Sequence, residues 1–158
     1  MADERLERLA RWTPLFILMY FSLQFAIRVG FSSNLETDEA QLVGQTHFAL
    51  GYGNSHPPLY NWLVSAMLWL TGSWPVAVAL VKKALLLGTY LLAFESIRMV
   101  TGRNLPGLLL VTSFLLLPQI VWKSQITLTH SVLVMFAAVA LFHAAVRIVN
   151  HGRLLDFL

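Results

Sequence analysis

The sequence contains no cysteine and few charged residues, and both absences narrow the possible classes of protein. Without cysteine there is no disulfide, no thiolate metal ligand and no thiol redox chemistry. Charged residues make up 12% of the 158-residue chain, against 57% hydrophobic residues and a mean hydropathy of +0.66. Soluble domains carry about 25% charged residues. The composition therefore predicts an integral membrane protein.

A pattern typical of nucleic-acid binding is also missing. Lysine and arginine outnumber aspartate and glutamate by 11 to 8, but no basic residue lies between Arg28 and Lys82. Most arginines instead flank apolar segments, as expected if basic residues stay on the cytoplasmic side of a membrane. We expect contact with a lipid bilayer and no nucleic-acid partner. The arginines expected on the cytoplasmic side are Arg5, Arg8, Arg11, Arg98, Arg103, Arg147 and Arg153.

The lengths of the apolar segments predict the fold class. A helix needs about 20 apolar residues to cross a hydrocarbon core of about 30 Å. We expect an all-α integral membrane protein with four transmembrane helices plus interfacial helices in a long first external loop. Pro118 should kink or end the third span. The predicted segments are a cytoplasmic lead-in (1–11), the spans (12–31, 74–100, 105–122 and 130–149), the external loop (32–73) and a cytoplasmic end (150–158).

The apolar stretch 59–71 is too short to be a fifth span. As a helix, its 13 residues would cover roughly 20 Å at 1.5 Å per residue. If this stretch crossed the membrane, Arg98 and Arg103 would lie outside, against the usual distribution of positive charge. We therefore expect an interfacial or re-entrant helix.

The polar interval 32–58 holds three of the eight acidic residues, Glu36, Asp38 and Glu39. An acidic loop between two apolar segments is typical of an active site at a membrane surface. Asp38 and Glu39 also begin a stretch with apolar residues at helical spacing. Acidic residues favour helix N-termini because they offset the helix dipole, so spacing alone favours a capping role.

Three basic residues occur inside or at the end of predicted spans. A lysine near the bilayer centre costs about 2.5–3.5 kcal/mol, so the adjacent Lys82 and Lys83 require a compensating environment. We expect one to line a polar cavity and the other to snorkel to the surface. Arg28 either faces protein or water, together with Gln24, or snorkels to the headgroups.

Two histidines are expected at the same membrane face as the acidic loop. His56 precedes two prolines, and His130 begins the last span. With a carboxylate they could bind a divalent cation, because imidazole and carboxylate suit zinc and manganese. A single interfacial histidine is more often only hydrogen-bonded.

The order of these features resembles the membrane glycosyltransferases of C-type fold. More narrowly, it is similar to the bacterial branch related to protein O-mannosyltransferases and to the aminoarabinose transferase that modifies lipid A. The resemblance covers 12–149. It is carried by Asp38-Glu39, the turn His56-Pro57-Pro58-Leu59-Tyr60, Gly72 at the end of the short helix, and the external loop from Ser124 to Ser131.

The resemblance implies transfer of a sugar from a polyprenyl-phosphate donor to a lipid, glycan or protein acceptor. The reaction would take place at the outer face of a bacterial cytoplasmic membrane, with the N-terminus in the cytoplasm. Asp38 would be the general base or acceptor-orienting carboxylate, with Glu39 beside it. Implied substrate-binding residues are His56, Tyr60, Lys82, Lys123 and His130, and the implied ligands of a divalent metal ion are His56 and His130.

Two departures from the family pattern are visible. Many relatives begin the fourth span with an aspartate, and His130 stands at that position here. Family members also carry further spans, and often an external domain, after this point. We therefore expect the chain to be the N-terminal part of a longer enzyme or a shortened homologue.

Two other classes of function remain open from the sequence. A small transporter or ion-binding protein would use Arg28, Lys82 and Lys83 to line a path. A non-catalytic scaffold would use the apolar helices to pack against partners.

Overall fold

In the computed structural model, the described residues are 2–32, 34–45, 48–52, 57–124 and 129–151. All regular secondary structure in these ranges is helical, which confirms the predicted all-α membrane fold. The helices in chain order are α1 (Ala2–Ala10), α2 (Thr13–Phe31), α3 (Thr37–Ala40), α4 (Leu59–Thr71), α5 (Trp74–Thr101), α6 (Asn104–Ser113) and α8 (Thr129–His151).

Within the described ranges, three helices are long and apolar enough to cross a membrane, namely α2, α5 and α8. Their bounds agree with three of the four predicted spans. All three owe their length to apolar runs that are bounded by polar or helix-ending residues. Gly102, for example, ends α5 in the left-handed conformation (φ 68°), which glycine adopts at little cost.

The remaining predicted span, 105–122, is an interrupted helix. The α6 helix ends at Ser113 and continues as a 3₁₀ turn, after which Leu117 is extended with φ −101° and ψ 103°. Pro118 then begins a π-helical turn. Proline lacks an N–H group and its ring clashes with the preceding helical turn, so the predicted kink is confirmed. No single described helix of spanning length occupies this segment.

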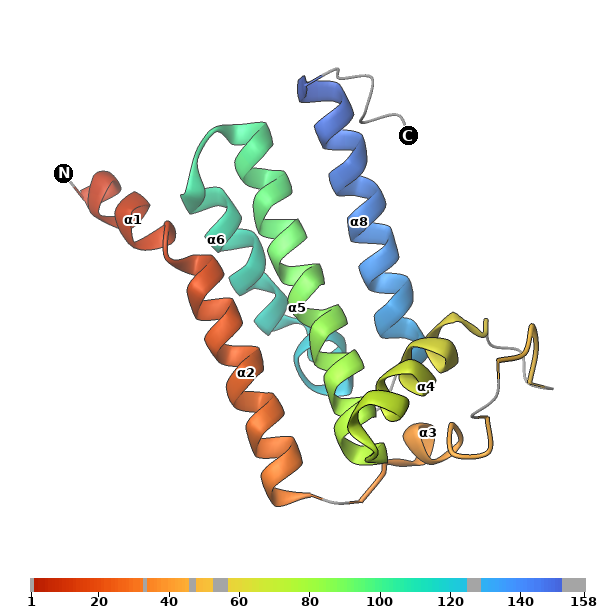
Figure 1. The fold of residues 1–158 in the computed structure, drawn as a ribbon. Helices are drawn as coiled ribbons and strands as arrows, with labels where there is room; N and C mark the ends of the chain where they lie inside the picture. Colours follow the sequence, from red (N-terminus) through yellow and green to blue (C-terminus); the bar gives the residue numbers. More distant parts are fainter. Residues whose placement is uncertain (1, 33, 46–47, 53–56, 125–128, 152–158) are drawn as a thin grey trace.

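The α5 helix is the centre of the molecule. Figure 1 shows α2 and α8 on either side of it and α6 alongside, and α5 packs against all three and against α4. The main core cluster joins these elements through Ile17 and Phe21 of α2, Leu86, Tyr90 and Phe94 of α5, Val111 of α6 and Val132 of α8. Because neighbouring helices all bury side chains against α5, groups on α5 can fix the position of elements distant in sequence.

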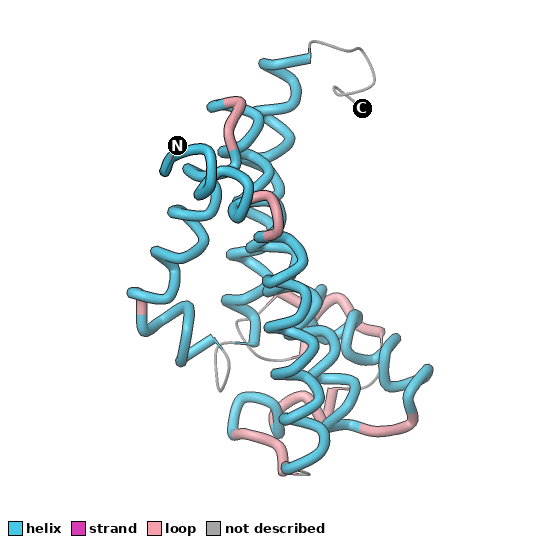
Figure 2. The backbone as a smooth tube through the Cα atoms, turned by 90° about the vertical axis from the view of Figure 1, so that its left-hand side faces the viewer, coloured by secondary structure: helices cyan, strands magenta, loops and turns pink. Residues whose placement is uncertain are grey.

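The loop between α2 and α5 lies at one end of the bundle. Figures 1 and 2 both show α3 and α4 at this end, which we call the loop end, and α1 toward the opposite end. The α4 helix has the predicted bounds and ends at Gly72, whose φ is 66°. Leu42, Tyr60, Val64, Val78 and Val81 form a second core cluster between the loop, α4 and α5. This cluster seats the loop on the end of α5.

At the opposite end, Glu7 of α1 caps the first turn of α6. Its carboxylate accepts hydrogen bonds from the backbone N–H and side-chain amide of Asn104 and from the backbone N–H of Leu105. Hydrogen bonding to Asn104 is the main reason that the pKa of Glu7 lies below its ordinary value. The first backbone N–H groups of a helix have no partner within the helix. Here they donate to the carboxylate of Glu7, which lies 97 residues before Asn104 in the chain.

Two glycines permit close helix contacts. A Cβ atom on Gly88 would lie 2.6 Å from the ring of Phe136, and one on Gly107 would lie 2.8 Å from the ring of Phe94 and 3.0 Å from its carbonyl oxygen. Small residues let membrane helices approach each other closely.

We expect Gly107→Ala to destabilise the protein, because Phe94 is buried and its backbone cannot move aside. Overpacking of this kind costs about 1–3 kcal/mol. Gly30→Ala is the matched control, since nothing lies within 4 Å of a Cβ there, and both changes gain similar helix propensity. Thermal unfolding in detergent measures the difference. Equal unfolding temperatures for the two variants would contradict the close contact.

Candidate functional site

The acidic loop folds so that Glu39 points into the protein. Glu36 is the N-cap of α3, and its backbone N–H donates to Glu39 Oε2 at 3.2 Å. The Glu36 side chain in turn accepts from the backbone N–H of Glu39, so the two residues form a capping box, and the capping role favoured by the spacing is confirmed for Glu39. The α3 helix is only four residues long, however, and the contacts of Glu39 extend well beyond it.

Glu39 is the centre of a buried ion cluster. Only 2% of its surface is exposed. Its Oε1 accepts a hydrogen bond from Lys82 Nζ at 2.8 Å, and its Oε2 accepts one from Arg28 Nη2 at 2.9 Å. We call Glu39, Arg28 and Lys82 the Glu39 cluster. It joins the loop to α2 and α5 across separations of 11 and 43 residues.

Arg28 also fixes the start of the loop. Its guanidinium donates to the carbonyl oxygen of Ser32 at 3.0 Å and to that of Asn34 at 2.7 Å. Of the two environments left open by the sequence, Arg28 therefore occupies the protein-facing one. The planar guanidinium can serve several acceptors at once because its five donors diverge in a fixed fork.

Lys82 and Lys83 are both buried, with 1% and 9% of their surfaces exposed. The prediction that one of them snorkels to the surface is wrong, because each has a partner inside the protein. Lys82 binds Glu39, and Lys83 Nζ donates to Gln24 Oε1 of α2 at 3.0 Å. These contacts supply the compensation that the intramembrane lysines required.

The Glu39 carboxylate is held in its charged form. Burial alone would raise its pKa, but the charge of Lys82 and the hydrogen bonds from Lys82, the Glu36 N–H and Arg28 together lower it. The net effect is a pKa below the ordinary value of 4.5. Glu39 is consequently ionised at neutral pH, and both of its oxygens are engaged.

The lowered pKa predicts a pH dependence of stability. Because the carboxylate is more acidic in the folded protein, its stabilising contribution is complete above the unfolded pKa and is lost as the pH falls through the folded value. We expect the unfolding temperature of the protein to exceed that of Glu39→Gln most clearly at neutral pH. The difference should shrink below pH 4.5, and a difference independent of pH would contradict the ionic contribution.

Asp38 and Glu39 have different environments. Successive residues on a helix point about 100° apart, and Asp38 is only half-buried whereas Glu39 is enclosed. A carboxylate already bound to two cations is a poor proton acceptor. Of the two predicted catalytic acids, Glu39 is therefore the less suited to accept a proton, and the catalytic role of Asp38 stays a prediction.

Tyr60 lies beneath the loop. It is completely buried, its ring centre lies 5.4 Å from that of His130, and burial together with the charge of Glu39 raises its pKa. The structure thus brings together four of the predicted site residues, Glu39, Tyr60, Lys82 and His130, around the start of α4 and α8. The neighbouring Asn61 side chain donates to Gln45 of the loop.

The other predicted residues are placed differently. His56 lies outside the described residues, and Lys123 is exposed on the π-helical turn. Among the residues that the structure describes, no three histidine, aspartate or glutamate side chains are close enough to hold a metal ion. The predicted pairing of His56 with His130 around a metal stays a prediction.

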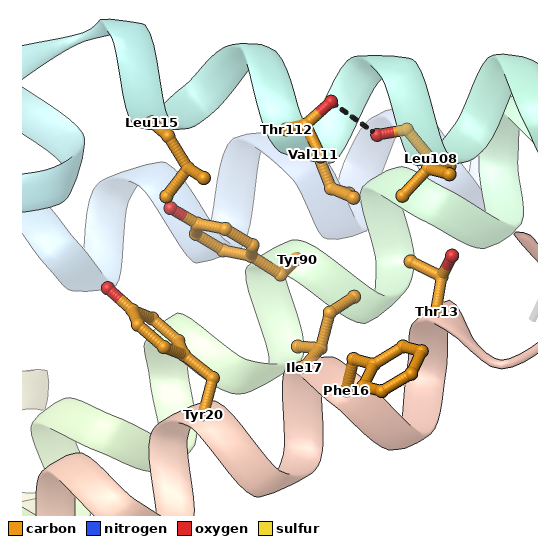
Figure 3. A pocket seen from close by; sticks show the side chains of 9 residues that line it. All are labelled: Thr13, Phe16, Ile17, Tyr20, Tyr90, Leu108, Val111, Thr112 and Leu115. Carbon is orange, nitrogen blue, oxygen red and sulfur yellow. Dashed lines mark hydrogen bonds between the residues drawn. The ribbon is translucent and has the colours of Figure 1, made fainter.

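Two cavities flank α2 at different heights. Near the loop end, a cavity of about 230 Å³ is lined by Phe21, Ser22, Phe25, Leu80, Lys83, Ala84 and Leu87. The second, of about 180 Å³, is almost entirely apolar and lies between Thr13 and Ile17 of the other half of α2 and Tyr90 of α5 (Figure 3). Only the first combines a cation with an apolar lining, and we call it the Lys83 groove.

The sequence did not reveal the Glu39 cluster. One feature of the sequence pointed to such a cluster. The loop acids have no basic residue near them in sequence, while Arg28 and Lys82 flank the interval 29–81. Isolated charges in apolar segments usually find a partner of opposite charge inside the protein. That rule would have paired Arg28 and Lys82 with a loop acid, although not with Glu39 in particular.

Together, the helices and the buried charges define a polytopic all-α membrane protein with an acidic loop fixed at one end. Comparison with known proteins adds two relatives from Rhizobium johnstonii (strain DSM 114642 / LMG 32736 / 3841). The lipopolysaccharide core galacturonosyltransferase RgtB is 32% identical over 148 residues, which are 93% of this chain and 30% of RgtB. The lipopolysaccharide core galacturonosyltransferase RgtA is 28% identical over 156 residues, 98% of this chain and 31% of RgtA.

The chain thus spans about 30% of the length of these curated relatives. No family model matches it, and no solved structure matches it. The predicted resemblance to a membrane glycosyltransferase is confirmed at this level. A closer relation to protein O-mannosyltransferases or to the aminoarabinose transferase, and the C-type fold, stay predictions.

Proposed function

We propose that this chain is the membrane module of a glycosyltransferase that moves a sugar from a polyprenyl-phosphate donor to a cell-envelope acceptor. The observation that carries this proposal is the similarity to two lipopolysaccharide core galacturonosyltransferases over nearly the whole chain. The sugar would be galacturonic acid or a related sugar, and the acceptor lipopolysaccharide or another envelope glycan, lipid or protein. The loop end would face the outside of the cytoplasmic membrane.

Asp38 is the proposed general base. An acceptor hydroxyl must lose a proton as its oxygen attacks the anomeric carbon of the donor, and a carboxylate within hydrogen-bonding reach can accept that proton. Asp38 has a partly exposed side chain beside the Glu39 cluster, so the contacts of Glu39 hold its backbone in place. A fixed base loses less conformational freedom when the substrates bind.

The Lys83 groove is the proposed site for the donor's phosphate and the first part of its hydrocarbon chain. Its aromatic and aliphatic lining suits a lipid chain, and Lys83 supplies a cation for the phosphate that leaves when the glycosidic bond breaks. Lys82 is less suitable because it binds Glu39. The same contacts of Arg28 and Lys82 give no support to a transport path lined by these residues.

The described residues do not gather a metal site, so no step of the proposed reaction is assigned to a metal. A divalent ion held by His56 and His130 is a separate prediction. In the proposed reaction, Asp38 takes the proton of the acceptor and the positive charge of Lys83 stabilises the departing phosphate.

A transfer assay with two donor types tests the function. Membranes containing the protein would receive galacturonic acid linked either to a polyprenyl phosphate or to a nucleoside diphosphate, together with lipopolysaccharide core as acceptor. We expect transfer from the lipid-linked donor alone. Transfer from the nucleotide donor alone would contradict the donor class, and no transfer from either would contradict the proposed galacturonosyl transfer.

We expect Lys83→Met to raise the KM for the lipid-linked donor about tenfold or more, because a charge-assisted hydrogen bond contributes about 1.5–3 kcal/mol. The KM for the acceptor should change much less, since the acceptor binds at Asp38. Steady-state kinetics with each substrate varied in turn measures both values. An unchanged donor KM would remove Lys83 from the donor site.

A further inference from the structure

Glu39 makes more contacts than a helix cap requires. Its capping contact is the hydrogen bond from the Glu36 N–H, yet the Glu39 carboxylate also binds two cations on two membrane-spanning helices. Burying Glu39 and Lys82, and partly burying Arg28, is costly unless the geometry of the three charged groups is well defined. The arrangement therefore fixes where α3 lies relative to α2 and α5.

An apolar contact supports the same position. Leu42 follows Glu39 by three residues, is 2% exposed, and packs with Tyr60, Val64, Val78 and Val81 of α4 and α5. The loop is thus held at adjacent points by an ionic contact and an apolar one. Asp38 precedes Glu39 directly, so its backbone has little freedom while these contacts persist.

We propose that Glu39 is a positioning residue that acts through Lys82 and Arg28 to hold Asp38 at the substrate-binding face. The expected effect on catalysis rests on the proposed function. The role of Glu39 in holding the loop in place does not depend on it. Glu39 itself exchanges no proton with a substrate. Loss of its charge releases the loop from α5 and leaves Lys82 without its carboxylate inside the membrane.

The ionic nature of the contact gives a distinctive mutational pattern. Removing one member of a buried ion pair leaves the other charge uncompensated, whereas replacing both members with neutral groups is often nearly neutral. Glu39→Gln and Lys82→Met should each be defective alone. The double variant Glu39→Gln/Lys82→Met should be less defective than Glu39→Gln, because the buried Lys82 charge no longer lacks its carboxylate, while Arg28 keeps its carbonyl acceptors at Ser32 and Asn34.

Loop mobility can be measured without any enzymatic assay. The chain has no cysteine, so Val43→Cys introduces a unique spin-label position on an exposed loop residue. The 158-residue chain would be reconstituted in lipid nanodiscs and studied by electron paramagnetic resonance. We expect Glu39→Gln to shorten the rotational correlation time of the label at least twofold. Asp38→Asn should leave the correlation time unchanged. So should Glu95→Gln, which breaks the ion pair between Glu95 and Arg98 near the far end of α5.

Activity of the same variants completes the test. Glu39→Gln should lower kcat at least tenfold, and the double variant with Lys82→Met should recover part of that loss. An unchanged label mobility in Glu39→Gln would overturn the positioning role. The positioning role would also be overturned if Glu39→Gln/Lys82→Met were as inactive as Asp38→Asn while the spin label kept its normal mobility. That result would indicate that Glu39 takes part in the reaction as an acid or base.

These outcomes separate the two proposals. If Glu39→Gln frees the label while Asp38→Asn retains full transfer, the positioning of the loop stands and the assignment of Asp38 as the base fails. If Asp38→Asn is inactive while Glu39→Gln keeps both normal mobility and normal kcat, the function stands and the positioning role fails.

Discussion

Replacing Asp38 with asparagine should lower the rate of sugar transfer by a factor of about 10²–10⁴, the usual contribution of a general base. Asparagine has nearly the same size and can still orient a hydroxyl by hydrogen bonding, but it cannot accept the proton. The loss should therefore fall mainly on kcat rather than on KM. Initial rates with saturating lipid-linked donor and acceptor measure the effect.

The control for this variant is Glu36→Gln, which removes an exposed acid two residues away in the same loop. We expect that variant to keep transfer within a few-fold of the original rate, and both variants to insert into membranes in equal amounts. Full activity of Asp38→Asn would refute the role of Asp38. Equal losses in the two variants would indicate a general effect of loop charge instead.

Lys82→Met should destabilise the protein by about 3 kcal/mol, the lower end of the cost of removing one partner of a buried ion pair. Methionine fills a similar volume, so the loss comes from the charge. Of its two cations Glu39 would retain Arg28, on Oε2, while its Oε1, which now binds Lys82 Nζ at 2.8 Å, would lose its cation. Thermal or chemical unfolding in detergent, followed by circular dichroism, measures the change.

The adjacent Lys83→Met provides the contrast. Lys83 is also buried in α5, and it donates a hydrogen bond to the neutral side chain of Gln24. Its replacement removes a costly intramembrane charge and leaves the bonds of Glu39 to Lys82 and Arg28 in place, so we expect a smaller destabilisation than in Lys82→Met. Equal destabilisation by both substitutions would show that volume or packing, rather than the pairing with Glu39, determines the cost.

The long apolar segments made most of the fold predictable. The helices α2, α4 and α5 begin and end within about one residue of their predicted limits, because membrane-length runs and Gly72 mark them directly. The interruption at Pro118 was also predictable, since proline disrupts a helix wherever it stands in the interior. Its extent was not, because the choice between a tilted span and a 3₁₀ turn followed by a π-helical turn depends on packing against α5.

The predicted helix in the acidic loop illustrates the limit of periodicity. Apolar spacing indicated a helical segment starting at Asp38, but the described helix is only Thr37–Ala40, followed by turns over 41–44 that include Gly44. Glycine lowers helix stability by about 1 kcal/mol relative to alanine. Leu42 then packs against α4 and α5, so tertiary contacts override the local pattern.

The partners of the charged residues could not be derived from spacing. Glu39 and Lys82 are 43 residues apart, and their pairing depends on how the loop folds back over the end of α5. The sequence indicates that buried lysines need a compensating partner. The prediction derived from it, however, gave a buried position to only one of Lys82 and Lys83. The structure buries both because two different elements, the loop and α2, each provide an acceptor.

The cap that Glu7 forms on α6 has a consequence for the order of assembly. During synthesis the α1 helix leaves the ribosome well before Asn104, which follows 97 residues later. The α1 helix can therefore form this contact only after the hairpin of α5 and α6 has been made. A chain arrested before Asn104 should carry an undocked α1, open to proteolysis, and completion of the hairpin should protect it.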